Sequence, residues 1–181
     1  MTTVVSIAFE STDSADALLR DTDNARVIEI LNAGLGRPLK YAFVMHAGVS
    51  IPDIKVQWST DSDMVQAFGF SYNKLSAASL EATFPCEVYL NIENWRSLRA
   101  HQAHWRLMGI KKYREYQVTH EFGHALGVGH LAPRGRVCNV MTQQTMKPTC
   151  AINSRPTSVD LDYFIKARAR GGFARVRQSK L

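Results

Sequence analysis

The pattern of apolar and polar positions changes its period several times along the chain, and each change marks an expected element. Residues 3–10 (TVVSIAFE) are rich in β-branched and aromatic side chains, which predicts a strand. Residues 11–32 begin with capping residues and then place apolar side chains at helical spacing, for example at Ala25, Ile28 and Leu31. We therefore expect a helix here, in one or two pieces, that ends at the Gly-Pro sequence AGLGRP.

Further strands are expected in the central part of the chain. Four segments there have a strand composition: 40–47, 53–60, 80–84 and 86–92. The second of them alternates Ile54, Val56 and Trp58 on one side. Pro85 separates the last two, and because proline cannot donate a ladder hydrogen bond, we expect one of the two at a sheet edge. The polar connection over 91–110 should be helical only in part.

Two helices with a loop-rich region between them are expected in the last third of the chain. One helix should run over about 112–126, where aromatic and apolar residues can cover a buried side. Residues 127–155 are rich in turn-forming residues. The last helix should begin near Thr157 or Ser158, and Asp160 at the capping-box position strengthens that start.

The order of these elements predicts an α+β fold. Helices should pack on one twisted mixed sheet, followed by a loop-rich C-terminal subdomain and a last helix. A chain of 181 residues has room for one ordinary domain with a core of its own. We expect that domain over 1–165, with an upper part at 1–127 and a lower part at 128–165, and a separate tail over 166–181.

Charge is distributed unevenly along the chain. The net charge is +6, and the segment 166–181 contains six basic residues and no acid. Subtracting these six from the 22 basic residues leaves 16, which equals the 16 acids of the remaining chain. The tail is thus either a solvated extension or a contact to nucleic acid or another anionic surface. Its last residues, Ser179, Lys180 and Leu181, also match a peroxisomal address signal.

Other features of the composition bear on the compartment. No apolar run approaches the roughly 20 residues of a membrane-spanning helix, and the N-terminus has no basic region, so we expect a monomeric intracellular protein without a signal peptide. Peroxisomal targeting through the last three residues and secretion by another route stay open. Cys86, Cys138 and Cys150 are an odd number, which favours three reduced thiols over a bridge between Cys138 and Cys150.

The segment VTHEFGHALGVGH carries the strongest candidate chemistry. His120 and His124 are four residues apart on the expected helix, so both imidazoles lie on one face and can bind one metal ion. Glu121 lies near them and is placed to take a proton from metal-bound water. Gly127 can turn the chain sharply and bring His130 back as a third nitrogen ligand. Three protein ligands with an open fourth position are typical of a catalytic zinc site.

The sequence HEFGHALGVGH resembles the HExxHxxGxxH motif of the metzincin clan of zinc metallopeptidases. The clan also has a methionine-containing turn, and CNVMTQQT supplies Met141 in the matching region. The resemblance implies a metzincin-like fold in which Met141 packs beneath the imidazoles as a hydrophobic floor. The specific match covers 120–141. No tyrosine follows two residues after Met141, where some members place an extra ligand, so we expect no fifth ligand.

The resemblance implies a zinc-dependent metalloendopeptidase with Zn²⁺ as cofactor and a protein or peptide as substrate. Glu121 would act as general base and later as proton donor to the leaving amine. One alternative is a non-catalytic zinc-binding protein attached to an anionic partner by its tail. Another is a zinc hydrolase that acts on a non-peptide amide. For the other histidines, His46, His101 and His104, we expect surface or packing roles.

Overall fold

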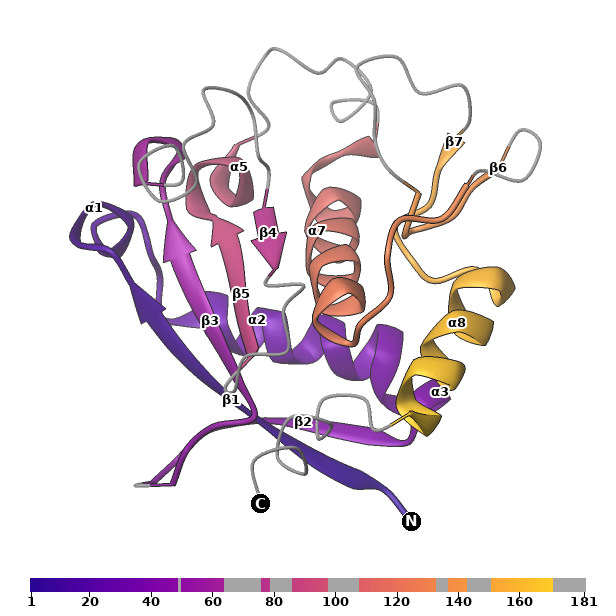
Figure 1. Ribbon diagram of the computed structural model, residues 1–181. Coiled ribbons are helices and arrows are strands. Elements are labelled where there is room, and N and C mark those ends of the chain that lie inside the picture. Colours follow the sequence, from indigo (N-terminus) through magenta and orange to yellow (C-terminus); the bar gives the residue numbers. More distant parts are fainter. Residues whose placement is uncertain are drawn as a thin grey trace.

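The computed structural model describes residues 1–48, 50–63, 76–78, 86–97, 108–132, 137–142 and 151–170. Its centre is a five-stranded sheet in the order β2-β1-β3-β5-β4, with helices packed against it (Figure 1). The strands are β1 (Thr3–Ser11), β2 (Tyr41–Met45), β3 (Ile54–Ser59), β4 (Ser76–Ala78) and β5 (Cys86–Asn91). The first three and β5 run parallel, and β4 is antiparallel to β5 at the edge. The predicted α+β class with a mixed sheet is confirmed.

The strands pair through the apolar positions that their alternation predicts. Ile7 pairs with Ile54, and Val56 pairs with Val88; all four side chains are fully buried. Buried and half-buried positions alternate along these strands, as expected where successive side chains point to opposite faces of a sheet. The expected strand 80–84 lies outside the described residues. The sequence did not predict β4, because its three small residues, SAA, show no alternation of apolar and polar side chains that could mark a strand.

The helix expected over 11–32 forms in two pieces, α1 (Asp13–Asp16) and α2 (Thr22–Leu31). The prediction that it ends at AGLGRP is wrong. The chain continues through a π-helical turn, η1 (Asn32–Gly36), and a short helix, α3 (Arg37–Leu39). Proline is tolerated in the first turn of α3 because its missing N–H has no partner within the helix there.

The long helix α7 (Ile110–Ala125) stands between the strands and the last helix, α8 (Ser158–Ala169) (Figure 1). It contacts β4, β5, α2 and the short helix α5 (Ile92–Arg96). Because neighbours surround α7, all of its residues from Tyr116 to His124 are buried. The predicted helix over 112–126 and the capped start of α8 at Thr157 are both confirmed.

The region expected to be rich in loops contains a small parallel pair of strands, β6 (Val137–Cys138) and β7 (Ala151–Ile152). Cys138 is disulfide-bonded and Cys86 is a free, buried thiol. The expectation of three reduced thiols is therefore wrong for Cys138. Cys150 lies outside the described residues.

Candidate metal centre

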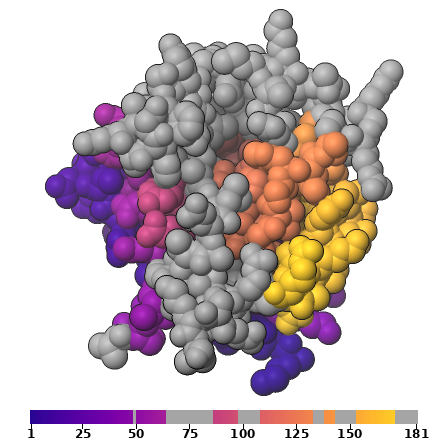
Figure 2. All heavy atoms as spheres, in the orientation of Figure 1, coloured from indigo at the N-terminus to yellow at the C-terminus, as the bar shows by residue number. Residues whose placement is uncertain are grey.

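Three imidazoles converge at the C-terminal end of α7. The Nε2 atom of His124 lies 3.1 Å from Nε2 of His120 and 3.2 Å from Nε2 of His130. His120 and His124 are buried, whereas His130 is exposed. The structure thus brings together the three histidines that the sequence singled out, and this group could hold a metal ion. Figure 2 shows that atoms at the end of α7 and the turn after it reach the surface beside α8.

Backbone carbonyls fix the protonation of the two buried rings. Nδ1 of His120 lies 2.7 Å from the carbonyl oxygen of Val140, and Nδ1 of His124 lies 2.8 Å from that of Val128. A carbonyl can only accept, so each Nδ1 carries the proton and each Nε2 presents a lone pair. Two such lone pairs 3.1 Å apart repel one another unless a cation lies between them. The arrangement therefore favours a bound metal over a hydrogen bond between the rings.

Gly127 ends α7 in the way the sequence predicts. Its φ of +93° lies in the left-handed region that glycine adopts at little cost. The N–H of Gly127 donates to the carbonyl of His124, and the N–H of Val128 donates to that of Gly123, which together form a Schellman motif. This turn places the Val128 carbonyl against His124 and directs the chain back to His130. The same turn thus positions both ligands.

Burial keeps the histidines neutral. It lowers the pKa of His120 and of His124 to about 4, and partial desolvation lowers the pKa of the more exposed His130 in the same direction. For His124 the neighbouring charge of His120 adds to this effect, while Glu121 and the Val128 carbonyl oppose it. A metal ion binds the neutral imidazole. The protein therefore holds its ligands ready for a metal at neutral pH.

Glu121 is buried beside these ligands, with 5% of its surface exposed. It lies close enough for its charge to raise the pKa of both His124 and Tyr113. The metal cluster itself comprises only the three imidazoles among the described residues, so Glu121 is a neighbour of the cluster and not a member of it.

Met141 is fully buried against α7. A Cβ atom added at Gly123 would overlap Sδ of Met141. The thioether therefore packs directly on α7 at a position between His120 and His124. The carbonyl of Met141 accepts the N–H of Leu131, the residue after His130. Met141 thus contacts the segments that carry all three ligands.

Asp160 holds the loop that carries Met141, which the sequence did not predict. Its carboxylate is fully buried and accepts the N–H groups of Val140 and Met141, both at 3.1 Å. It also accepts the N–H and the hydroxyl of Thr157, both at 2.7 Å, which completes the capping box of α8. The capping box was visible in the sequence. The hydrogen bonds from Asp160 to the loop were not visible in the sequence, because Val140 lies 20 positions away along the chain.

The remaining expected residues lie away from this cluster. Nε2 of His46 lies 3.1 Å from the carbonyl of Gly48, as a surface role predicts, and His101 and His104 lie outside the described residues. The first residues of the expected tail belong to α8, where the guanidinium of Arg168 lies 5.1 Å from the ring centroid of Tyr41. Residues 171–181, including the last three, lie outside the described part of the chain.

Comparison with known families places the chain in a family. Residues 35–169 match a family described as "Protein of unknown function (DUF3152)". The chain belongs to this family. The DUF3152 match runs from η1 to the end of α8, so it includes all three histidines, Glu121, Met141 and Asp160. No curated protein matches the sequence. Among the described helices, none is long and apolar enough to cross a membrane.

Proposed function

We propose that the chain is a zinc-dependent metalloendopeptidase of metzincin type. The observation that carries this proposal is the convergence of three imidazole Nε2 atoms next to a buried glutamate. A purely structural zinc site is usually closed by four side chains. Here three nitrogen ligands and a neighbouring carboxylate leave a position for water and substrate.

The ligand set fits zinc. Nitrogen ligands of a tetrahedral zinc ion lie about 2.0–2.1 Å from the metal, which places them roughly 3.3 Å from each other. The Nε2 separations of 3.1 and 3.2 Å are close to this value. Three neutral imidazoles without a thiolate are also a typical ligand set of catalytic zinc. His120, His124 and His130 would hold the ion.

The bound zinc would supply acidity to water and polarise the scissile carbonyl. Glu121 takes the proton of the attacking water and later gives it to the leaving amine. The residues around it support this role, because His120 and His124 keep their Nδ1 protons on backbone carbonyls and cannot compete as bases. Burial of Glu121 keeps bulk water from solvating the carboxylate that performs the transfer.

The sheet edge supports a peptide as substrate. The edge strand β4 is antiparallel to β5 and contacts α7, the helix that carries two of the ligands. An edge strand offers main-chain donors and acceptors on its outer side, and an extended peptide can pair with them. A small non-peptide amide has no comparable need for such an edge.

Replacement of Glu121 by Gln tests the proposal. The variant should bind zinc as wild type does, because Glu121 is not a ligand, and it should lose hydrolysis of a peptide library by at least about 100-fold. Zinc content is measured by elemental analysis and cleavage by mass spectrometry. Glu115→Gln is the matched control, since Glu115 is on the same helix and pairs with Arg155 instead of facing the cluster.

Three outcomes would contradict parts of this proposal. Equal cleavage by wild type and Glu121→Gln would remove the role of Glu121. Stoichiometric zinc without cleavage of any library peptide by wild type would favour the non-catalytic alternative. Cleavage of simple amides without cleavage of peptides would favour the non-peptide hydrolase.

A further inference from the structure

Four arginine side chains meet in a second pocket, away from the histidines. The pocket has a volume of about 340 Å³ and lies where the start of α2, α5 and the first half of α7 come together. Arg20, Arg26, Arg96 and Arg114 line it, and none of the three clustered histidines does. Like charges repel at such short range, so a protein gathers them only where something compensates the repulsion.

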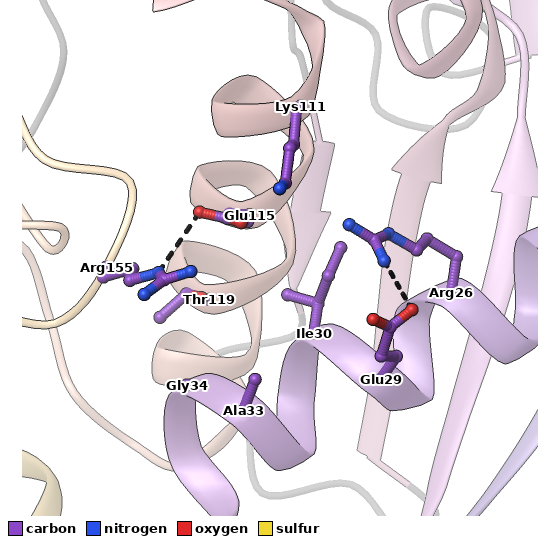
Figure 3. Close-up of a pocket in the computed structure, with 9 residues that line it drawn as sticks. All are labelled: Arg26, Glu29, Ile30, Ala33, Gly34, Lys111, Glu115, Thr119 and Arg155. Carbon is purple, nitrogen blue, oxygen red and sulfur yellow. Dashed lines mark hydrogen bonds and ion pairs between the residues drawn. The ribbon is translucent and has the colours of Figure 1, made fainter.

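The carboxylates of the pocket compensate only half of this charge. Two acids line it, and each already has an arginine partner. Asp23 is paired with Arg96 and also accepts the indole N–H of Trp95 at 2.9 Å. Glu29 is paired with Arg26 (Figure 3). The other two arginines form no ion pair with any described residue, which leaves two positive charges in excess.

Arg114 is held in place with its terminal amino groups available. Its Nε donates to the carbonyl of Trp95 at 2.8 Å, and its guanidinium lies 4.9 Å from the ring centroid of the same residue. Both contacts fix the plane of the guanidinium and use neither terminal nitrogen. Burial lowers the pKa of Arg114, and the charges of Arg96 and Arg26 add to this effect while Asp23 opposes it. The guanidinium is therefore oriented, and the nearby carboxylate of Asp23 is already paired with Arg96.

A neighbouring pocket shows how closely charge is balanced elsewhere on these helices. Arg26 and Glu29 also line this pocket of about 150 Å³ between α2 and α7 (Figure 3). There Glu115 accepts from Arg155 at 3.4 Å, and Lys111 is the one further cation that lines it. Since two of its three cations are paired with carboxylates, the excess of charge is concentrated in the first pocket.

We propose that the pocket lined by Arg20, Arg26, Arg96 and Arg114 binds an oxyanion of the phosphate class, free or as the end group of a larger ligand. The planar guanidinium can donate two parallel hydrogen bonds to a phosphate group. Several guanidinium groups around one anion strengthen its binding through their charge and select its shape through these paired hydrogen bonds. The ten positions 98–107 that follow α5 contain no acidic residue in the sequence. The proposal does not depend on the zinc peptidase function.

Isothermal titration of the full chain with inorganic phosphate tests this inference. The ionic strength is kept constant, and the titration is done with and without saturating zinc, so that phosphate at the metal centre would appear as a difference between the two. We expect one saturable site whose affinity does not depend on zinc. Phenyl phosphate in a parallel titration distinguishes the sources: tighter binding than phosphate indicates a larger phosphorylated ligand, and equal or weaker binding indicates free phosphate.

Two variants and one control locate the site. Arg114→Lys keeps the charge but loses the paired hydrogen bonds, and Arg20→Gln removes an exposed side chain that forms no hydrogen bond or ion pair with a described residue. Each should weaken phosphate binding by about tenfold. Lys111→Gln removes one charge from the same helix beside the neighbouring pocket and should weaken it less than about twofold. No saturable binding to wild type, or an equal loss with Lys111→Gln, would overturn the proposal.

Discussion

Gly123 is the residue on which the packing around the metal ligands depends most directly. It lies on α7 one position before His124, and its missing side chain makes room for Met141 and Phe164. Both of these side chains are fully buried, so neither can move into solvent to accept a larger neighbour. The spacing HExxHxxGxxH in the sequence leaves this position unspecified, whereas the packing requires glycine.

Replacement of Gly123 by Ala should therefore destabilise the fold. The new Cβ would overlap Sδ of Met141 and lie 2.9 Å from Cε1 of Phe164. Helix propensity favours alanine by about 1 kcal/mol, and overpacking costs about 1–3 kcal/mol, so we expect a net loss of roughly 1 kcal/mol in the free energy of unfolding. Gly129→Ala is the control, since nothing lies within 4 Å of its added Cβ. Equal stability of the two variants would mean that Met141 can move aside.

Cys86 should react slowly with thiol reagents in the folded protein. Burial, with the charge of Glu87, raises the pKa of its thiol from the ordinary 9.0 to about 11. The reactive thiolate is the minor form below the pKa, so at pH 8 its fraction is roughly a hundredfold lower than in the unfolded chain. Iodoacetamide labelling followed by mass spectrometry should show slow labelling in buffer and fast labelling in urea. Fast labelling of folded protein at pH 8 would contradict the buried position.

At the level of elements, one carboxylate connects α8 to the metal centre. Asp160 caps α8 and also binds the backbone of Val140 and Met141. The carbonyl of Val140 in turn accepts Nδ1–H of His120. The start of the last helix thus sets the orientation of a metal ligand on another helix.

Replacement of Asp160 by Asn should weaken both the cap of α8 and the hydrogen bonds to the backbone of Val140 and Met141. The amide removes the charge and turns one acceptor into a donor that faces N–H groups, which should cost roughly 2–4 kcal/mol of stability. Zinc affinity should fall by about tenfold, because partners of the ligands orient them. Urea unfolding and competition with a zinc indicator measure the two effects. Asp162→Asn changes an exposed carboxylate of the same helix and should alter neither; a similar loss there would exclude the specific role of Asp160.

The whole molecule should gain stability from the metal. The three histidines come together only when α7 and the turn after it have folded, so zinc held by them would bind the native state in preference to the unfolded chain. At a zinc concentration 100 times Kd the gain is about 2.7 kcal/mol, which for a chain of this length raises Tm by roughly 5–10 °C. Differential scanning calorimetry with zinc and with a chelator measures this shift.

Two variants define the origin of this shift. His130→Ala should remove most of it, and His46→Ala, which changes a histidine outside the cluster, should keep it. If zinc leaves the Tm of wild type unchanged, or shifts that of His130→Ala by the same amount, the three imidazoles do not form the site.

Local features of the chain explain which predictions succeeded. The histidines at 120 and 124, the left-handed Gly127 and the capped start at Thr157 all act within a few residues, so their spacing in the sequence is also their spacing in space. The prediction that the first long helix ends at AGLGRP is wrong because its glycines and proline are accommodated in helical turns. In the fold, η1 and α3 extend that helix to Leu39.

The sequence by itself thus determined the three histidines that cluster, the turn that returns the third, and the α+β class. Each of these depends on periodicity or on contacts between residues close in the chain. Only the tertiary structure decided how the ligands are held and what lies around them. The carbonyl of Val140 comes from a segment 20 positions after His120, and the pocket arginines come from positions as far apart in the chain as Arg20 and Arg114. No pattern along the chain predicts these contacts between distant residues, because they form only when the helices pack on the sheet.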